Sequence, residues 1–385
     1  MTQHQKHAKL AKPYAGKFHH NEIAVLGTPC GNIKQLSYQI IKQLKGTMRV
    51  AYVDADHQSA DTDDVDPNTS LSYGAYSEYV DKINFHRFDT HQLFNDYSNR
   101  QLFAYNDLVM VNGNHFQAEK QIVVIDPKKN LEKKLHKLTN VKLILFAENT
   151  MEIPSYLSEH IRNISEIPLL KIDDAQQISE WIKNDYTRQL PKINGLVLAG
   201  GKSVRMRRDK STIDYHGSPQ RDHMYQLLQK LTHETYISIR HDQQGVAENG
   251  ISSISDTFIG LGPYGAILSA FRMDPNAAWL ITACDQPYLD EATLTTLIRA
   301  RNRSKVATCF YNPETDFPEP LITIWEPRAY GVLLNFLSLG YSCPRKILIN
   351  SDIEMIRLED DLPLRNVNTP EEYVEAMKLL GKSAH

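Results

Sequence analysis

Short runs of apolar residues alternate with longer amphipathic stretches along the chain. In the first half these runs are EIAVLG, MRVAYVDAD, DLVMVNG, QIVVID, VKLILFA and IPLLKI. Runs of this length that are rich in β-branched residues are typical of strands buried on both faces, as in parallel sheets. The stretches between them have apolar residues at helical spacing. The first half is therefore predicted to form a doubly wound α/β domain.

The second half repeats this pattern. Its apolar runs are NGLVLAGG, ETYISIR, AAWLITACD and KVATCFY, and its helical stretches are DHMYQLLQKL, EATLTTLIRAR and TPEEYVEAMKLLG. The last of these has a threonine before proline, acidic residues in its first turn and a closing glycine, which together predict a capped helix. A second mainly parallel sheet with helices on both faces is expected. The fold class is α/β with two doubly wound sheets.

A chain of 385 residues fits two domains, because one domain usually takes about 100–200 residues. The helical stretch DAQQISEWIKNDY would end the first domain. We interpret Thr187–Ile193 as the linker, because Pro191 interrupts a helix and a new strand follows. The predicted domains are residues 1–189 and 190–385.

The charges balance closely, with 43 basic and 46 acidic residues and a net charge of −3. This balance argues against a nucleic-acid partner or a basic membrane-surface protein, so any polyanion site must be local. No apolar run approaches the roughly 18 residues of a membrane span. The four cysteines are far apart and lack metal-ligand spacing, which argues against a disulfide framework or zinc site. A cytoplasmic protein is expected.

The stretch INGLVLAGGKSVRMRRDK ends an apolar run in two glycines, Gly200 and Gly201, and then places five basic residues close together. Glycines at the carboxyl end of a buried strand let backbone N–H groups approach a phosphate, whose charge the following cations neutralise. A tight turn with solvated basic residues is the plainer alternative. A Walker loop is excluded, because the pattern counted from Gly195 finds Gly201 where lysine is required.

The same stretch matches the nucleotidyltransferase loop L-A-G-G-x-S-x-R-M-G-x-D-K at Leu198, Ala199, Gly200, Gly201, Ser203, Arg205, Met206, Asp209 and Lys210. Further along, the chain contains Asp256 before GLGPYGAI, and then ITACDQPYL, PEPLITIWEP and NVNTPEEY. With these motifs in this order, the second half resembles the MobA-like molybdenum cofactor guanylyltransferases.

This resemblance implies a Rossmann-like fold and a transfer of GMP from GTP to the phosphate of molybdenum-molybdopterin, with release of pyrophosphate. It assigns the guanine nucleotide to Leu198, Ala199, Gly200, Gly201, Lys210, Asp256 and Gly262. It implies that Asp285 binds Mg²⁺, and it places Arg205, Asn366 and Asn368 on the pterin side. Lys210, Asp285 and Arg205 would be the catalytic residues.

The residue types suit this chemistry. Joining two phosphates is hindered mainly by repulsion and alignment, which cations, a metal and positioning overcome. A phosphate monoester has a second pKa near 6 and is largely ionised at neutral pH, so no strong base is required. A helix cap or surface acid is the alternative for Asp285, and turn or cap residues for Asn366 and Asn368. Cys284 is expected to be a small buried residue rather than a nucleophile.

One position departs from the family pattern, because Arg207 stands where the family has glycine. If this position needs a positive φ, the substitution costs on the order of 1–2 kcal/mol, and the side chain would crowd the second substrate. Arg207 could instead point to solvent or contact a phosphate. These three interpretations stay open.

The first half also has a glycine loop, but Asn32, Ile33 and Lys34 stand where a P-loop counted from Gly27 needs glycine, lysine and serine or threonine. The segment DLVMVNGNH resembles D-L-V-x-V-E-G of the MobB-like GTP-binding adaptor family, with Asn112 in place of glutamate. The resemblance extends over residues 21–172 and implies a related α/β domain. The missing P-loop lysine predicts that this domain lacks NTPase activity. The acids and histidine of VDADHQSADTDD indicate either a metal site or a solvated loop.

Two other functions remain open at this stage. One is a cytidylyltransferase, or a transferase acting on another small phosphate acceptor. The other is a non-catalytic nucleotide-binding or cofactor-delivery protein. Molybdoenzymes and cofactor-pathway proteins are the protein partners that the resemblance suggests.

Overall fold

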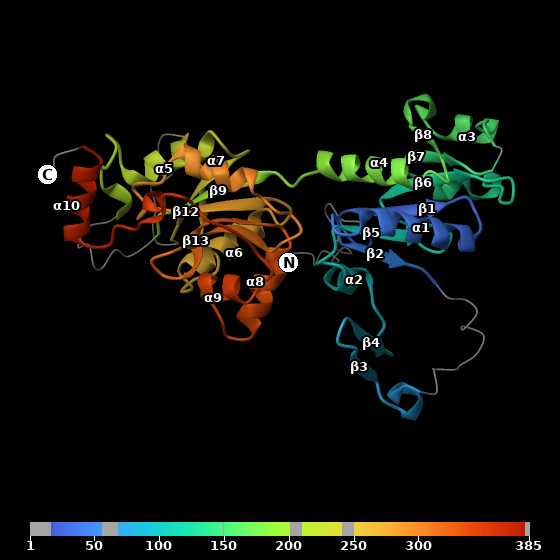
Figure 1. Cartoon of the computed structure of the whole chain (residues 1–385), viewed down its shortest axis with the longest axis horizontal. Coiled ribbons are helices and arrows are strands. Elements are labelled where there is room, and N and C mark those ends of the chain that lie inside the picture. Colours follow the sequence, from blue (N-terminus) through green and yellow to red (C-terminus); the bar gives the residue numbers. More distant parts are fainter. Residues whose placement is uncertain (1–16, 56–67, 149, 201–209, 241–249, 382–385) are drawn as a thin grey trace, which may run out of the picture. The chain divides into compact units, whose positions relative to one another are not determined.

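The computed structural model describes residues 17–55, 68–148, 150–200, 210–240 and 250–381. The chain divides into two compact units, Met1–Gln189 and Leu190–His385 (Figure 1). Both are α/β units with mainly parallel sheets, which confirms the predicted fold class.

The first unit contains one six-stranded parallel sheet in the order β2-β5-β1-β6-β7-β8. These strands lie on the six predicted apolar runs. The elements are β1 (Glu22–Leu26), α1 (Cys30–Leu44), β2 (Val50–Val53), η1 (Ser70–Tyr73), β3 (Ser77–Asp81), β4 (His86–Thr90), α2 (Asp96–Leu102), β5 (Leu108–Asn112), β6 (Lys120–Ile125), η2 (Glu132–Lys137), β7 (Val141–Phe146), α3 (Ser155–His160), η3 (Ile164–Glu166), β8 (Leu169–Lys171) and α4 (Ala175–Arg188).

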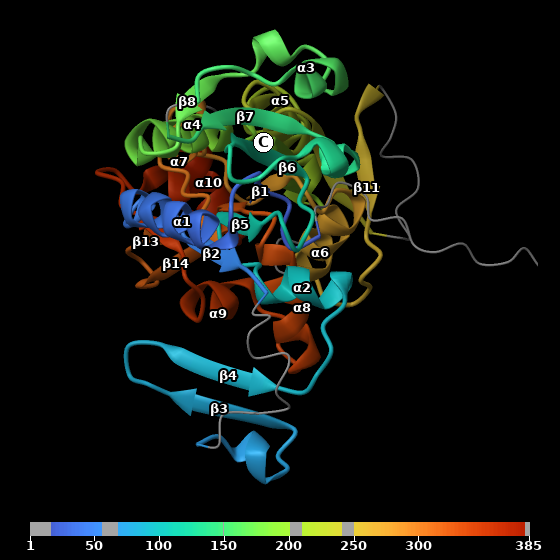
Figure 2. The same cartoon turned by 90° about the vertical axis from the view of Figure 1, so that its right-hand side faces the viewer.

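Helices cover both faces of this sheet. On one face, α1 and α4 bury Ile33, Ile40 and Ile178 against the strands. On the other, Leu157 of α3 packs against the sheet together with residues around η2. The antiparallel hairpin β3–β4 lies apart from the six-stranded sheet (Figure 2). The sequence did not predict this hairpin, because SEYVD and HRFDT contain no run of buried apolar residues.

The second unit contains a seven-stranded sheet in the order β11-β10-β9-β12-β14-β13-β15. β14 is antiparallel to both of its neighbours, and the other pairs are parallel. The elements are β9 (Ile193–Leu198), η4 (Lys210–Thr212), α5 (Gln220–Gln229), β10 (Thr235–Ile239), β11 (Ser253–Ser255), α6 (Pro263–Met273), β12 (Ala278–Ala283), α7 (Glu291–Arg299), β13 (Ala307–Asn312), β14 (Phe317–Trp325), α8 (Ala329–Ser338), α9 (Pro344–Ile349), β15 (Glu354–Ile356), η6 (Leu362–Leu364) and α10 (Pro370–Leu379).

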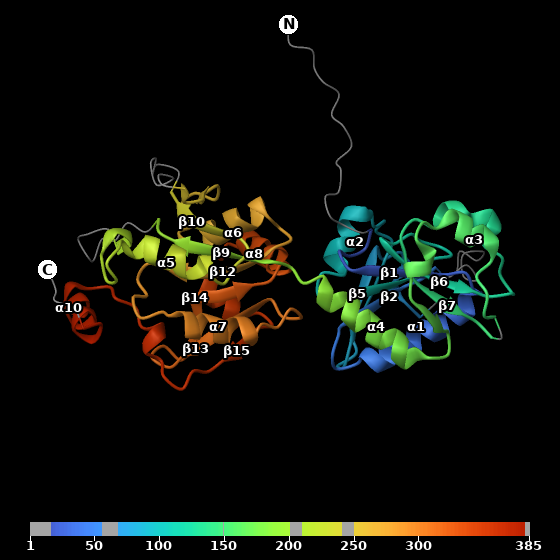
Figure 3. The same cartoon turned by 90° about the horizontal axis from the view of Figure 1, so that it is seen from above.

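Two helix layers enclose this sheet. The core on one face is formed with α6, α8 and α9, and the core on the other with α5 and α7. α10 lies outside both layers (Figure 3). It begins with a capping box in which the Thr369 hydroxyl accepts from the Glu372 N–H, which confirms the predicted capped helix.

The predicted linker was too long at both ends. α4 continues through Thr187 to Arg188, and β9 already begins at Ile193. Pro191 restricts mainly the residue before it, so it leaves the last turn of α4 intact. Among the described residues, no helix is both long enough and apolar enough to cross a membrane.

Candidate functional site

The candidate site lies where four neighbouring parallel strands of the second sheet end. Leu198, the last residue of β9, pairs with Ser238 of β10 and with Ala283 of β12. Parallel strands place their carboxyl ends at one edge, where open α/β sheets bind ligands. Leu198, Ala199 and Gly200 begin the glycine turn at this edge. Gly201 and Arg205, like Arg207, lie outside the described residues.

Gly200 has a cationic neighbour that the sequence motifs did not single out. Arg240 donates from Nη1 to the Gly200 carbonyl oxygen at 3.3 Å. A Cβ atom added at Gly200 would lie 3.2 Å from Arg240 Cγ, which belongs to a flexible side chain. The start of the glycine turn therefore lies beside a positive charge. The only sequence signal was the position of Arg240 directly after a predicted strand.

Three predicted residues from distant parts of the chain come together on the β12 side of this turn. Lys210 Nζ lies 2.5 Å from Asn368 Oδ1 and 3.5 Å from Asp285 Oδ2. The Val367 N–H donates to the Asp285 carbonyl oxygen at 2.8 Å, which holds the segment before α10 against the turn after β12. An ammonium, a carboxylate and an amide thus share one group of contacts.

The Asp285 carboxylate is only partly neutralised in this arrangement. Burial raises its pKa, and the nearby Lys210 ammonium opposes that rise. Oδ1 is buried and has no hydrogen-bond partner among the described residues. A buried polar atom without a partner is costly, so this oxygen is available to a ligand or a cation. The helix-cap alternative for Asp285 is wrong, because Asp290 caps α7 by accepting from the Thr293 N–H.

The donors around Asp285 decide whether the site fits the predicted magnesium ion. The described residues contain no group of three or more His, Cys, Asp or Glu side chains that could hold a metal ion. Mg²⁺, however, often binds one or two carboxylates and takes its remaining ligands from substrate phosphates and water. A single carboxylate with an unpartnered oxygen fits that mode of binding. The site fits a magnesium ion held jointly with a nucleotide.

Asn366 and Asn368 do more than form the turn or cap before α10. Thr369 and Glu372 cap α10, and the Asn368 N–H joins them by donating to Glu372 Oε2 at 2.5 Å. The Asn368 side chain is therefore left to contact Lys210. Asn366 Oδ1 is buried and has no hydrogen-bond partner among the described residues.

Asp256 and Gly262 lie on the other side of the glycine turn. Asp256 follows β11 and accepts from the Ser238 hydroxyl at 2.9 Å, and burial raises the pKa of its carboxyl. Gly262 precedes α6 with φ 57° and ψ −137°, a conformation that essentially only glycine adopts. Both residues thus lie at the expected edge, in a group separate from Lys210, Asp285 and Asn368.

Two buried polar side chains beside Asp285 were missed by sequence reasoning. Gln286 accepts from the Ala283 N–H at 3.0 Å and so shapes the turn after β12. Glu319 on β14 is 1% exposed and accepts from Asn312 Nδ2 at 3.0 Å. Burial raises the pKa of Glu319, and the Asp285 charge raises it further. Gln286 lies in ITACDQPYL and Glu319 in PEPLITIWEP, but the sequence motifs predicted no role for either residue.

Comparison with known protein families gives a match to the MobA-like NTP transferase domain over residues 195–352. The molybdenum cofactor guanylyltransferase of Pseudomonas aeruginosa is 30% identical over 185 residues, which are 47% of this chain and 93% of that protein. The molybdenum cofactor biosynthesis bifunctional protein of a Synechocystis species is 36% identical over 180 residues, or 46% of this chain. The chain spans about half, 52%, of the length of that bifunctional relative.

Solved structures also resemble parts of the chain. The molybdopterin-guanine dinucleotide biosynthesis protein A of Archaeoglobus fulgidus covers 49% of the chain, and 98% of its own length, at 19% identity and a TM-score of 0.43. Bacillus subtilis MobB covers 43% of the chain, and 96% of its own length, at 14% identity and a TM-score of 0.33. Both scores are below 0.5, so neither structure supports an assignment by itself.

Proposed function

The chain belongs to the MobA-like NTP transferase family, and from this premise we propose that it transfers GMP from GTP to the phosphate of the molybdenum-molybdopterin cofactor, releasing pyrophosphate. The observation that carries the proposal is the contact of Lys210 with both Asp285 and Asn368 beside the glycine turn. This contact joins Lys210, which the resemblance assigns to the nucleotide, to Asp285, assigned to the metal, and to Asn368, assigned to the pterin. The two substrates would then meet at Lys210.

The chemistry requires charge neutralisation and alignment more than proton transfer. The attacking phosphate monoester is already largely ionised at neutral pH. The Lys210 ammonium reduces the repulsion between that phosphate and the nucleotide, and Asn368 holds the ammonium in place. Arg205, outside the described residues, is proposed to add a second cation on the pterin side. These residues would hold the two phosphates in line, which favours the transfer.

A bound Mg²⁺ would supply further neutralisation of the triphosphate. Asp285 would hold it through Oδ1, the oxygen without a partner, while Lys210 remains near Oδ2. Deprotonation of Asp285 is disfavoured by burial, and a cation at Oδ1 would reverse that preference. We propose that Leu198, Ala199, Gly200, Gly201, Asp256 and Gly262 hold the guanine nucleotide along the same edge of the sheet.

The direct test is pyrophosphate release by the full-length chain with GTP, Mg²⁺ and molybdenum-loaded molybdopterin. The wild type should release pyrophosphate only when the pterin is present. Asp285→Asn should remove the activity, whereas Glu359→Gln, a change at an exposed acid of the same unit, should leave it intact. Release that persists in Asp285→Asn would contradict the assigned role of this carboxylate.

Base preference needs a separate measurement, because the contacts above involve phosphates rather than a base. Thermal unfolding with GTP, CTP or ATP, each with Mg²⁺, compares the three nucleotides directly. A ligand at a hundredfold its Kd stabilises by about 2.7 kcal/mol. Preference for CTP would favour the cytidylyltransferase alternative. No shift with any nucleotide would exclude both transferase assignments and leave a cofactor-delivery role.

For the first unit we propose a MobB-like domain without NTPase activity. Thr28 of its glycine loop donates to Asp126 Oδ2 at 2.5 Å, so this hydroxyl is engaged by a carboxylate. No lysine follows in the P-loop position. GTP hydrolysis that is present in the wild type and is retained in Asp285→Asn would contradict this proposal.

A further inference from the structure

The carboxyl edge of the first sheet collects a thiol, an imidazole and a carboxylate that the proposed transfer reaction does not use. Cys30 begins α1 after β1, Asp54 follows β2, and His115 follows β5. We propose that these three residues form a thiol-reactive site at which Cys30 exchanges with a small anionic disulfide.

The sulfur of Cys30 has two polar neighbours suited to a thiolate. His115 Nε2 lies 3.3 Å from Sγ, within reach of the thiol proton. Asn114 Nδ2 donates to the same sulfur at 3.3 Å and also to the Thr28 carbonyl oxygen at 3.0 Å. A thiol is activated by a base within hydrogen-bond reach and by donors that favour its ionised form. Cys30 is partly exposed, so a reagent can reach it.

A fixed carboxylate lies beside the same nitrogen of the imidazole. Asp54 Oδ1 lies 3.9 Å from His115 Nε2, close enough to stabilise the imidazolium. This carboxylate also accepts from Asn112 Nδ2 at 2.8 Å and from the Tyr52 hydroxyl at 2.7 Å. Glutamate at position 112, as in the MobB-like motif, would place a like charge against Asp54. The asparagine at this position is therefore part of what permits the cluster.

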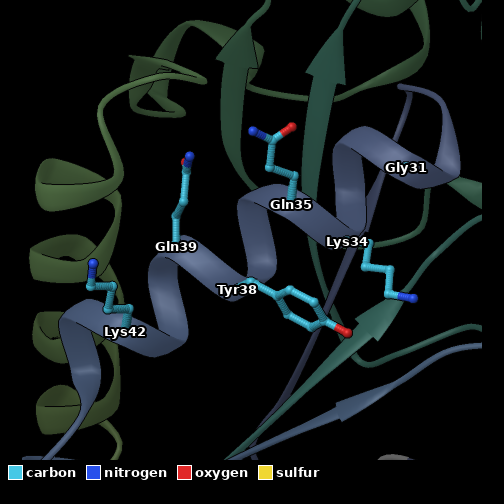
Figure 4. A pocket seen from close by; sticks show the side chains of 6 residues that line it. All are labelled: Gly31, Lys34, Gln35, Tyr38, Gln39 and Lys42. Atoms are coloured by element: carbon cyan, nitrogen blue, oxygen red, sulfur yellow. The ribbon is translucent and has the colours of Figure 1, made fainter.

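The surroundings of the thiol favour a negatively charged reagent. Lys129 Nζ lies 3.4 Å from the Thr28 carbonyl oxygen, and Lys137 Nζ lies 3.2 Å from the Asn114 carbonyl oxygen. A shallow pocket on α1 begins at the residue after Cys30 and has two lysines and no acidic residue in its lining (Figure 4). The lining consists of Gly31, Lys34, Gln35, Tyr38, Gln39 and Lys42. Lys34 and Lys42 thus add positive charge along the helix that Cys30 begins.

The exchange requires no additional oxidant. The Cys30 thiol gives its proton to His115 Nε2, and the thiolate attacks one sulfur of the disulfide. A new S–S bond forms at Cys30 while the original S–S bond breaks, and the departing thiolate takes the proton from the imidazolium. Cys30 is oxidised and the departing sulfur is reduced. Cys30 is the only cysteine in residues 1–189, so this unit offers no second thiol of its own to release the adduct.

The test compares Cys30 with the exposed Cys343 of the same chain. The full-length variants Cys343→Ser and Cys30→Ser each keep one accessible thiol, since Cys284 and Cys309 are buried. Each variant is treated with glutathione disulfide from pH 5.5 to 8.5, and the rate of adduct formation is followed by intact mass. Among the described residues, the titratable and charged groups around Cys30 include His115, Asp54, Tyr52, Lys129 and Lys137.

An unperturbed thiol has a pKa near 8.5 and is only about 1% ionised at pH 6.5. Cys30 should therefore react at least about tenfold faster than Cys343 at pH 6.5, and the difference should narrow as pH rises. In the Cys343→Ser background, His115→Gln should slow Cys30 at pH 6.5 and have little effect at pH 8.5. A purely structural role for His115 would not change the shape of this pH profile. Far-UV circular dichroism checks that each variant is folded.

Equal pH profiles for Cys30 and Cys343, or a Cys30 profile unchanged by His115→Gln, would overturn the proposal. The ratio of the Cys30 rate to the Cys343 rate should be lower for cationic cystamine than for glutathione disulfide. A higher ratio for cystamine would overturn the proposed preference for an anionic disulfide. The outcome is independent of the transferase proposal, because Cys30→Ser should keep pyrophosphate release unchanged.

Discussion

The two sheets each place a glycine turn after a central strand, but the side chains around the two turns differ. In the second unit, Gly200 lies beside Arg240, and Lys210 contacts a carboxylate with an unpartnered oxygen. In the first unit, the Thr28 hydroxyl of the corresponding turn is engaged by Asp126. The turn in the second unit therefore has cations that can meet a polyanion and a carboxylate oxygen that can meet a metal ion, whereas the hydroxyl of the turn in the first unit is engaged by a carboxylate of the same unit.

The glycines themselves show the same difference. Gly27 has φ +98°, and a Cβ there would lie 2.2 Å from the Val124 carbonyl oxygen. The glycine is needed because the backbone itself closes the turn. Among the described residues, the nearest atom to a Cβ at Gly200 would be Arg240 Cγ at 3.2 Å, in a flexible side chain, and the backbone atoms nearby lie at ordinary contact distances of 3.6 Å and 4.0 Å. The comparison teaches that a strand–glycine–helix pattern fixes where a site can form, while the neighbouring side chains decide which chemistry it supports.

Of the changes that test this difference between the two turns, loss of the Asp285 carboxylate is expected to have the largest effect. We expect Asp285→Asn to lower the rate of pyrophosphate release by about a hundredfold or more, because it removes the carboxylate that we propose to hold a metal beside the nucleotide. Steady-state assays on the full chain measure this. A loss of less than about tenfold would mean that charge at this edge does not distinguish the two sheets.

Removal of the Lys210 ammonium should have the next largest effect. Lys210→Met should raise the KM for GTP roughly ten- to hundredfold, the range expected for a lost hydrogen bond to a charged group. Lys128→Met in the first unit is the matched control, because Lys128 is exposed and paired with Glu148. If the two variants had the same KM, the proposed nucleotide role of Lys210 would be wrong.

A pair of glycine substitutions sharpens the comparison directly. Gly27→Ala should destabilise the first unit by at least about 2 kcal/mol, through the left-handed φ and the clash with a carbonyl oxygen. Gly200→Ala should change unfolding by less than about 0.5 kcal/mol and instead weaken GTP binding. Thermal unfolding with and without GTP gives both readouts. The opposite pattern would show that Gly200, rather than Gly27, is the structural glycine.

The smallest expected effect concerns the pH dependence of stability through Glu319. A group whose folded pKa is raised stabilises the protein below its unfolded pKa, and loses that contribution as pH rises through the folded value. Glu319→Gln does not titrate, so relative to wild type it should gain up to about 1 kcal/mol between pH 4.5 and pH 7. Urea unfolding at the two pH values measures this. A loss of stability relative to wild type over this range would mean that Arg345 and Asn312 lower the pKa of Glu319 more than burial raises it.

Much of the fold was predictable because its central strands are continuous apolar runs. The strands β1, β9 and β12 lie on such runs, as their burial on both faces requires. The hairpin β3–β4 and the short edge strands β11 and β15 lack this signal. The direction of β14 was not predictable either, since an apolar run does not encode which way its neighbours run.

The site was predictable only where a motif marked it. Asp285 was found because it follows a buried strand within a family motif, but its contact with Lys210 and Asn368 depends on three segments that only the fold brings together. Asn368 also lies beyond the residues matched by the family, which end at position 352. Arg240 follows a predicted strand and Glu319 lies within PEPLITIWEP, but neither pattern indicates which residues these side chains contact.

The hydrogen bond from the Val367 N–H to the Asp285 carbonyl oxygen has a consequence for biosynthesis. The amide that holds Lys210 is translated long after the glycine turn and the aspartate that it joins. A nascent chain therefore lacks the complete arrangement until Asn368 has left the ribosome. Pterin capture by the proposed site would therefore begin only after residue 368 has been translated and the segment before α10 has packed against the turn after β12.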